Sequence, residues 1–464
     1  MEILGEGQSA GHGGSGARLH TVLVLCPTHR DHRELKRLFR PGTTYLYHDY
    51  ASTSLEELIG GKAADDQIAA DPLAEVERIL AKIGGLKIEA VVSTDDYPGS
   101  ALAAVVAREL GLPGPAPALN LICQHKYLSR LAQSALVPAA VPPFALIDVA
   151  DEGPLPEALA YPVLVKPVKS FFSIGAETVA SRPELAAAKA YWSELDQFFL
   201  PLERLLRCYL GIEIGSKRLI AEGLLQGEQV TVEGYVFGRE VGVLGVVDSV
   251  MFPGTRVFSR FDYPSALPRS VQARMEEIAK VLMGGLGFDN GMFNIEMMYD
   301  ARTGRIGIIE INPRMASQFA DLYEKVDGTN SYTVLLDIAG GRAPVIRRRD
   351  GAHAFAASCV LRCFEDGIFA ALPGEEEFAL LARRHPDIRI ELHGAIGRRL
   401  SDDMQDGHSF RYGIINLGGR DRDDVLAKFE ACRQALGVSF LSVDALPPVH
   451  DTIRAVEPLA AVQL

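Results

Sequence analysis

The sequence has 464 residues and a mass of 50.3 kDa, which is too long for one compact core and predicts about three domains. Its formal net charge of −13 argues against nonspecific nucleic-acid binding, although a magnesium–nucleotide site is itself acidic and is compatible with that charge. No run of about 18 uncharged apolar residues is present, so we expect no membrane span.

The cysteines and the N-terminus indicate where the protein works. Six scattered cysteines without a CxxC pair predict free thiols in a reducing, cytoplasmic environment. Residues 1–19 are rich in Gly and Ser and lack an apolar core of the signal-peptide kind, so they predict a disordered tail.

Residues 20–124 show strands alternating with helices, which predicts a doubly wound parallel sheet. No GxGxxG follows the first strand, which disfavours an NAD site. Polar residues such as Thr28, Asp95 and Asp96 stand at strand ends, where either loop polarity or substrate contact explains them. The expected strands are His20–Cys26, Thr44–Tyr47 and Ile88–Ser93, and the expected helices are Leu73–Ile83 and Ser100–Leu110.

The middle of the chain predicts a helix over His125–Ala135, with Leu128 and Leu131 facing inward. Prolines end this helix, and a series of strands follows before the next helix. The expected elements are strands at Tyr161–Pro167, Leu219–Leu225, Val230–Val236 and Gly242–Val250, and a helix at Val271–Leu286.

A lysine and a loop of small residues suggest an anion site. Lys166 lies among apolar strand residues, so its ammonium group must either extend to solvent or meet an anion. The loop Lys169–Gly175 follows and can offer backbone N–H groups and the hydroxyls of Ser170 and Ser173 to phosphates.

A β-hairpin is expected over Gly291–Arg314, with its turn at Gly304. Residues spaced by two on a strand share a face, and a residue of the partner strand can face them. Two carboxylates, an amide oxygen and a guanidinium on one face would hold Mg²⁺ and a triphosphate, although a solvated face explains the same charges. The residues concerned are Glu296, Glu310, Asn312 and Arg314.

These features in this order resemble the ATP-grasp superfamily of carboxylate–amine ligases. The resemblance covers roughly residues 20–345 and is carried by a helix with Lys126, a Lys-Pro strand with Lys166 and a strand with Glu222. Its most specific part is Glu296 followed by the run Glu310-Ile-Asn-Pro-Arg314. The loop after Lys166 departs from the family, because it has phenylalanines where glycines are frequent.

The resemblance implies roles in binding ATP. Lys126 and Lys166 look like the lysines that contact its phosphates, and Lys166 lies deeper, beside the adenine. Either Glu228 or Gln229 would hold the ribose, because the register is ambiguous by one residue. The segment that looks like the adenine-binding hinge comprises Glu222, Gly223 and Leu224.

The resemblance also implies the metal and transfer site. Glu296 and Glu310 resemble the two carboxylates that bridge Mg²⁺ (or Mn²⁺) ions, and Asn312 would complete the second site. Arg314 resembles the arginine that stabilises the transferring phosphoryl group, with Lys166 as the second catalytic cation. The expected cofactors are therefore ATP and Mg²⁺.

Substrate contacts are less well defined by the sequence. The aromatic, Pro-containing loop Met251–Pro264 carries Arg256 and Arg260, which either bind a substrate carboxylate or are ordinary solvated arginines. Ser317 follows Arg314 closely enough to meet the acyl acceptor.

We therefore expect an α/β and α+β multidomain chain with an ATP-grasp fold, a Rossmann-like N-terminal domain and a C-terminal α+β cap. The cap is similar to that of the amino-acid-ligase and biotin-carboxylase-like branches. The expected domains are residues 20–124, 125–345 (subdomains 125–220 and 221–345, with ATP between them) and 346–464.

The expected reaction joins a small-molecule carboxylate to an amine through an acyl phosphate and releases ADP and phosphate. Activation of bicarbonate in the manner of biotin carboxylase is one alternative, and a nucleotide-binding regulatory protein without turnover is another. We expect no nucleic-acid or membrane partner, and the sequence leaves both the substrates and a homodimer open.

Overall fold

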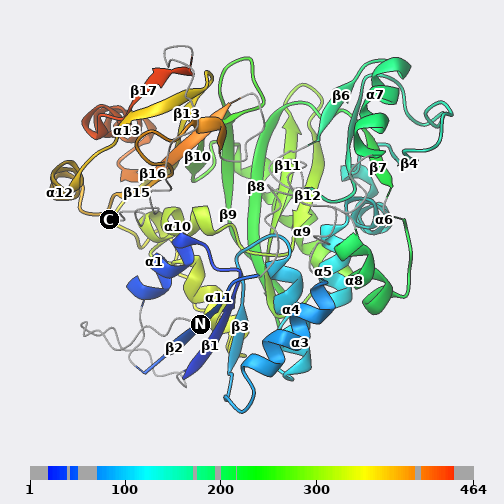
Figure 1. Ribbon diagram of the computed structural model, residues 1–464, viewed down its shortest axis with the longest axis horizontal. Helices are drawn as coiled ribbons and strands as arrows, with labels where there is room; N and C mark the ends of the chain where they lie inside the picture. The colour runs from blue at the N-terminus through cyan, green and yellow to red at the C-terminus, as the bar shows by residue number, and fades with distance from the viewer. Residues whose placement is uncertain are drawn as a thin grey trace, which may run out of the picture. The chain divides into compact units, whose positions relative to one another are not determined.

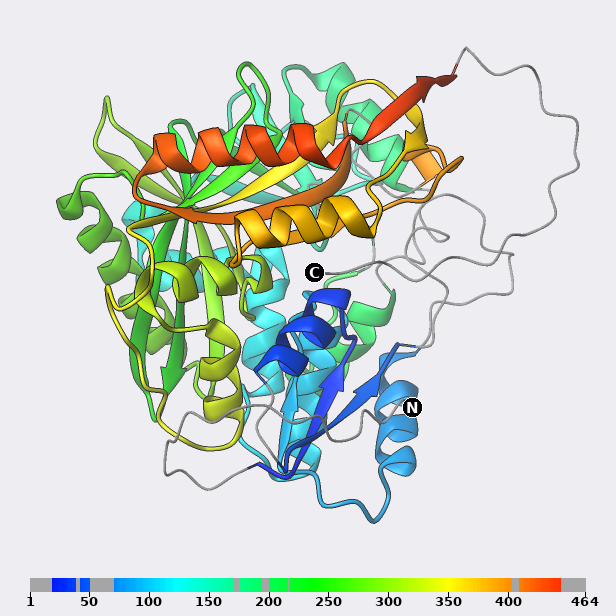
Figure 2. The ribbon, with the colours of Figure 1, turned by 90° about the vertical axis from the view of Figure 1, so that its left-hand side faces the viewer.

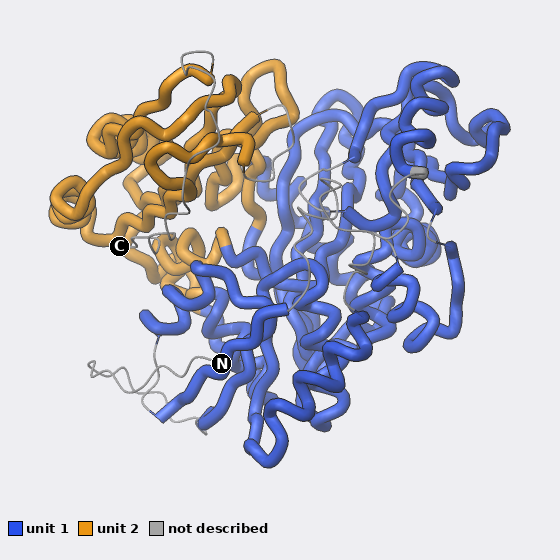
Figure 3. The backbone as a smooth tube through the Cα atoms, viewed as in Figure 1, with its two compact units in different colours: residues 1–245, 267–317, 331–346 blue, residues 246–266, 318–330, 347–464 orange. Residues whose placement is uncertain are grey.

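The structure is a computed structural model in which residues 19–38, 42–50, 71–170, 175–193, 200–215, 217–402 and 409–443 are described. The chain divides into two compact units, drawn in blue and orange in Figure 3. Unit 1 comprises residues 1–245, 267–317 and 331–346, and unit 2 comprises residues 246–266, 318–330 and 347–464. The tail expected over residues 1–19 lies almost entirely outside the described residues, and the domain boundaries given above stay a prediction.

The N-terminal part of unit 1 contains the expected parallel sheet (Figures 1 and 2). Its elements are β1 (Thr21–Leu25), α1 (His29–Arg37), β2 (Thr44–His48), α3 (Pro72–Lys82), β3 (Ala90–Val92) and α4 (Gly99–Glu109). The strand order is β2-β1-β3, and Leu23, Val91 and Leu102 lie in one buried core. Because all the strands run the same way, the loops after β1 and β3 leave the same edge of the sheet.

An antiparallel sheet with order β4-β7-β5-β6 and four helices follow in unit 1. The elements are α5 (Pro117–Gln124), α6 (Lys126–Leu136), β4 (Phe144–Asp148), β5 (Val163–Pro167), β6 (Glu177–Val179), α7 (Arg182–Ser193), α8 (Leu200–Leu210) and β7 (Arg218–Gly223). In the β5–β7 pair, Lys166 stands opposite Ile220 and Leu164 stands opposite Glu222. Lys166 and Glu222 are therefore diagonal neighbours on one face of the sheet.

The remaining part of unit 1 contains the hairpin that the sequence predicts. Its elements are β8 (Glu228–Phe237), α9 (Arg269–Leu286), β11 (Gly291–Asp300), β12 (Arg305–Asn312) and α11 (Ser331–Ala339). Strand β11 pairs with both β8 and β12, and its alternate residues Phe293, Ile295 and Met297 are fully buried. Gly304 has φ +69°, which a glycine adopts without strain, so the turn between β11 and β12 forms as predicted.

Unit 2 is built on antiparallel strands covered by helices. Its elements are the end of β9 (Glu240–Met251), β10 (Phe258–Tyr263), α10 (Ala320–Asp327), β13 (Phe355–Cys363), β14 (Gly367–Ala371), α12 (Glu375–Arg384), β15 (Arg389–Leu392), β16 (Phe410–Gly419), α13 (Arg422–Leu436) and β17 (Ser439–Ser442). Strands pair in the order β9-β10-β13-β16-β15, and α13 lies along β16 (Figure 2). Phe355, Ile415 and Val425 share the buried core.

Two local expectations were wrong. The segment Met251–Pro264 is not a loop throughout, because Phe258–Tyr263 forms β10, which pairs with β9 and β13. Leu131 is 46% exposed, so α6 does not turn it inward.

The six cysteines are all in the described part of the chain and are free thiols, as expected. Among the described helices, none combines the length and apolar composition needed to cross a membrane.

Candidate active site

The hairpin brings together the acidic residues that the sequence singled out. Glu296 of β11 stands directly opposite Glu310 of β12, and Asn294 stands opposite Asn312. Asn312 Nδ2 donates to Asn294 Oδ1 at 2.9 Å, and Asn294 Nδ2 donates to the carbonyl oxygen of Arg314 at 3.1 Å. These amide contacts fix the end of β12 and the backbone that leads to Arg314.

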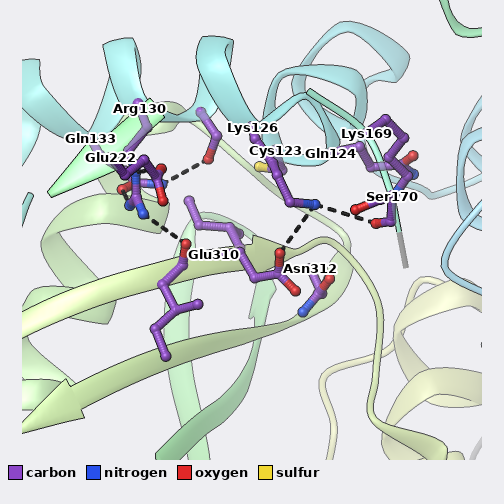
Figure 4. A pocket seen from close by; sticks show the side chains of 13 residues that line it. Cys123, Gln124, Lys126, Arg130, Gln133, Lys169, Ser170, Glu222, Glu310 and Asn312 are labelled. Carbon is purple, nitrogen blue, oxygen red and sulfur yellow. Dashed lines mark hydrogen bonds and ion pairs between the residues drawn. The ribbon is translucent and has the colours of Figure 1, made fainter. Parts of the chain in front are cut away.

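Lys126 reaches this carboxylate pair from the N-terminus of α6. His125 caps the helix through its Nδ1, which accepts from the N–H of Leu128, and the Lys126 side chain extends into a pocket. Its Nζ lies 3.3 Å from Glu310 Oε2 and donates to the carbonyl oxygen of Ser170 at 3.3 Å (Figure 4). A cation from the helix, a carboxylate from the hairpin and the backbone at Ser170 therefore meet at one point.

Beside this point lies a buried ion network. Glu222 Oε1 accepts from Arg130 Nε at 2.6 Å, and Glu222 Oε2 lies 2.8 Å from Lys166 Nζ. All three side chains are at most 5% exposed. Arg130 also donates to Gln133 Oε1 and to the carbonyl oxygen of Ile309, so both its Nη groups are used. Although burial opposes its ionised form, Lys166 and Arg130 lower the pKa of Glu222 to about 2.

Among the described residues, the two hairpin carboxylates, Glu296 and Glu310, do not each have two cationic partners as Glu222 does. Burial, together with the nearby Glu310 carboxylate, raises the pKa of Glu296 to about 8. Lys126 and Lys166 act in the opposite direction on Glu310, whose pKa they lower against the effect of burial. Gln229 Nε2 donates to Glu296 Oε2 at 2.9 Å, whereas Glu228 is exposed at the start of β8.

This donor set fits a divalent cation. Mg²⁺ prefers hard oxygen ligands and usually keeps several waters or phosphate oxygens beside one or two carboxylates. Glu296, Glu310 and Asn312 supply two carboxylates and an amide oxygen, and no third acidic, His or Cys ligand joins them within the described residues. A bound cation would offset the burial and the Glu310 charge that together raise the pKa of Glu296.

The pocket contains further residues, including Arg130 of the helix with Lys126, for which the sequence predicted no role in the site. Arg130 and Gln133 belong to α6, and Lys169 lies two residues after the end of β5. Lys169 is buried and pairs with Asp96 Oδ2 at 2.6 Å. The available signal was the i, i+3 and i, i+4 spacing of polar residues on α6, which places Lys126, Arg130 and Gln133 on one side of the helix. The pocket is lined by Cys123, Gln124, Lys126, Ser129, Arg130, Gln133, Lys169, Ser170, Glu222, Ile309, Glu310, Ile311 and Asn312.

The structure places the other expected site residues as follows. Gly223 ends β7 and Leu224 follows it, Ser170 lines the pocket, and Ser173 lies outside the described residues. Arg314 Nε lies 3.4 Å from Asp96 Oδ1, and Ser317 Oγ accepts from Arg30 Nη1 at 3.0 Å.

The two arginines expected to bind substrate belong to unit 2. Arg256 is exposed, whereas Arg260 donates from Nε to both carboxylate oxygens of the fully buried Asp262. Arg422 Nε lies 3.2 Å from the same carboxylate. Arg260 is therefore held in an internal ion pair of unit 2.

Comparison with known proteins identifies the domain. A family model described as an ATP-grasp domain matches residues 159–321, a span that includes Lys166, Glu222, Glu296 and Glu310. The chain therefore contains an ATP-grasp domain, which confirms the resemblance drawn from the motifs. No curated protein matches the chain.

Solved structures share the fold at low sequence identity. The L-amino acid ligase of Bacillus licheniformis aligns with a TM-score of 0.67 and 16% identity, covering 92% of this chain and 100% of that one. The phosphoribosylglycinamide synthetase of Anaerococcus prevotii aligns at 0.61 and 14%, covering 91% and 99%. The biotin carboxylase domain of Hydrogenobacter thermophilus 2-oxoglutarate carboxylase, a dimer with MgADP, ADP and bicarbonate, aligns at 0.61 and 16%, covering 92% of each chain. The ATP-grasp fold expected from the sequence is thus confirmed.

Proposed function

We propose that the protein is an ATP-dependent carboxylate–amine ligase that forms an amide or peptide bond and releases ADP and phosphate. The observation that carries this proposal is the meeting of Lys126, Glu310 and Ser170 beside the Glu296–Glu310 pair. Cations for a triphosphate and oxygen ligands for a metal thus share one pocket, which is what phosphoryl transfer needs in place of a protein nucleophile.

ATP would enter between the buried network and the hairpin. Lys126 and Lys166 bind phosphate oxygens, Gly223 and Leu224 offer backbone groups to the adenine, and Ser170 and Ser173 complete the phosphate contacts. Gln229 is the better ribose candidate, because its side chain lies on the same side of the sheet as Glu296 whereas Glu228 is exposed.

The metal site would be formed by Glu296, Glu310 and Asn312. Bound Mg²⁺ or Mn²⁺ would neutralise the phosphate oxygens and align them for transfer. Arg314 follows β12 directly and would stabilise the charge that develops on the phosphoryl group, while Lys126 holds Glu310 towards the same place.

The reaction would proceed in two balanced steps. A carboxylate oxygen of the first substrate attacks the γ-phosphorus, the bond from phosphorus to the β–γ bridging oxygen breaks, and ADP leaves. The nitrogen of the amine substrate then attacks the acyl carbon and loses a proton, and phosphate leaves with the oxygen that came from the carboxylate. Arg256 and Ser317 stay as proposed substrate contacts, and Arg260 could serve only after leaving Asp262.

The similar solved structures support this choice without deciding the substrates. Two of them are an L-amino acid ligase and a phosphoribosylglycinamide synthetase, and the biotin carboxylase domain was solved with MgADP and bicarbonate. We therefore keep bicarbonate activation as the second candidate. We also propose that the ATP-grasp domain begins at residue 125 and that the C-terminal domain begins at residue 346. The substrates are proposed to be small molecules, and the protein is proposed to form a homodimer.

An ADP-release assay with Mg²⁺ and a panel of amino acids, amines and bicarbonate tests the function. ADP release that needs both a carboxylate and an amine supports the ligase. ADP release with bicarbonate and free biotin alone would favour the second candidate, and tight ATP binding without turnover on the whole panel would contradict both enzymatic functions.

A further inference from the structure

The loop after β3 brings a carboxylate of the N-terminal sheet to the pocket. The carbonyl oxygen of Asp96 accepts from Ser100 Oγ at 2.7 Å and from Gln124 Nε2 at 3.1 Å. Gln124 in turn donates to Ser100 Oγ and to Asn120 Oδ1, and it lines the pocket itself. The backbone at Asp96 is therefore anchored from two helices.

The Asp96 side chain lies beside two cations, Lys169 after β5 and Arg314 after β12. Its Oδ2 accepts from Lys169 Nζ at 2.6 Å, and its Oδ1 lies 3.4 Å from Arg314 Nε. Lys169 is 6% exposed and Asp96 is 16% exposed, so this pair is largely shielded from water. Burial opposes the charge on Asp96, but Lys169 and Arg314 hold its pKa well below the usual range.

Such an arrangement has a clear physical use. Lys126, Lys169 and Arg314 are long cationic side chains that repel one another and lose rotamer freedom when they are fixed. A carboxylate held from behind orders two of them before a phosphate arrives. Groups that are already in place when charge develops stabilise a transition state more effectively than groups that must reorganise.

We propose that Asp96 is a positioning residue for phosphoryl transfer, which holds Lys169 and Arg314 towards the phosphate end of the pocket, and that Lys169 is a phosphate-binding residue of this site. The inference rests on the proposed function and extends it to a segment outside the matched ATP-grasp span. Asp96 acts through its two partners, whereas Lys169 and Arg314 contact the phosphates themselves.

The neighbouring residue provides a matched control. Asp95 carries the same side chain, but its Oδ2 accepts from the backbone N–H of Gly99 at 2.7 Å, at the start of α4. Replacing Asp95 with Asn therefore changes a helix start next to the site, without removing the partner of Lys169 or Arg314.

The experiment compares the full-length wild type with Asp96→Asn, Lys169→Met, the double variant and Asp95→Asn. For each we measure kcat and KM for ATP in the ADP-release assay, and the thermal midpoint. We expect kcat of Asp96→Asn to fall by about 10- to 100-fold with KM for ATP changed less than about threefold, as is typical of residues that orient a functional group. The double variant should be no slower than Lys169→Met by more than about threefold, and Asp95→Asn should keep kcat within about twofold.

The outcomes separate this inference from the function beneath it. A wild type without turnover overturns the proposed function and this inference with it. A wild type that turns over overturns only the inference if Asp96→Asn keeps its kcat, or if its loss adds fully to that of Lys169→Met. A parallel fall of kcat and thermal midpoint in both Asp variants would instead assign Asp96 a purely structural role.

Discussion

The two ends of the pocket differ in how many cations accompany their carboxylates. At one end, Glu222 is enclosed by Arg130 and Lys166, and its two oxygens each have a cationic partner at 2.6 and 2.8 Å. At the other end, Glu296 and Glu310 face each other across two strands, and among the described residues the cation in direct contact is Lys126, at 3.3 Å from Glu310. Figure 4 shows Glu222 beside Arg130 on the left, and Glu310 beside Lys126 nearer the centre.

The comparison separates what holds the fold from what awaits a ligand. A buried charge with both oxygens paired is satisfied within the protein, and removing one partner leaves the others uncompensated. The partly buried carboxylates of Glu296 and Glu310 lie opposite each other, and burial together with the Glu310 charge raises the pKa of Glu296 to about 8. Replacing Glu222 should therefore mainly lower stability, and replacing Glu310 should mainly lower activity.

The largest effect is expected for Glu310→Gln. Losing one metal ligand should lower the rate of ADP release by about 10³-fold or more, because the phosphate charge is no longer neutralised during transfer. Glu277→Gln, on the exposed side of α9, is the control and should retain wild-type activity. Wild-type turnover by Glu310→Gln would contradict the assignment of the metal site.

Glu222→Gln should show the opposite behaviour. Because it leaves Arg130 and Lys166 buried without their counter-charge, the free energy of unfolding should fall by about 3–5 kcal/mol. Urea titrations of this variant and of Glu310→Gln, both without metal, make the comparison. If Glu310→Gln were the more destabilised of the two, the contrast between the two ends would be wrong.

Divalent cations should stabilise the free protein through the hairpin. With Mg²⁺ or Mn²⁺ at a hundred times its dissociation constant, binding adds about 2.7 kcal/mol to the free energy of unfolding. The rise in thermal midpoint on adding the cation should be absent in Glu296→Gln and present in Glu222→Gln. An equal rise in the wild type and in Glu296→Gln would show that the cation binds elsewhere.

The smallest effect concerns His125, which precedes Lys126. Burial lowers its pKa to about 3, below the value of about 6.5 for an unfolded chain, so the folded state requires the neutral ring. Stability should therefore be lost as pH falls through about 6.5, by up to about 1.4 kcal/mol per pH unit. His125→Asn can still cap α6 but cannot titrate, so unfolding free energies at pH 7.0 and 5.5 should differ less in this variant than in the wild type. An equal pH dependence in both proteins would contradict the assignment.

The sequence predicted the hairpin well because its information is local. Alternating apolar residues mark both strands, and Gly304 sets the turn. Counting from that turn would place Glu296 opposite Ile309, and a register shift between Glu296 and Met297 places it opposite Glu310 instead. The run from Glu310 to Arg314 then indicated a site for Mg²⁺ and a triphosphate. The identification of the ATP-grasp fold followed from the order of such local features.

Helix α6 shows where local information fails. Apolar spacing favoured Leu128 and Leu131 as the inward face, but the buried residues are Ser129, Arg130 and Gln133. That face meets Glu222 and the carbonyl oxygen of Ile309, which come from strands far along the chain. Apolar spacing predicts the buried face of a helix only where the neighbouring element is apolar. It cannot reveal a polar partner that comes from a distant part of the chain. The contact of Asp96 with Lys169 and Arg314 could not be predicted either, because the three residues are far apart in the sequence.

The origin of the oxygen in the released phosphate tests the central claim most directly. A carboxylate substrate found in the ADP-release panel is labelled with ¹⁸O in both carboxylate oxygens, and the phosphate is analysed by mass spectrometry after turnover with the amine and Mg²⁺. The account predicts one ¹⁸O atom in each phosphate and one in the amide product, because the carboxylate attacks the γ-phosphorus. Unlabelled phosphate, or release of AMP and pyrophosphate, would contradict it.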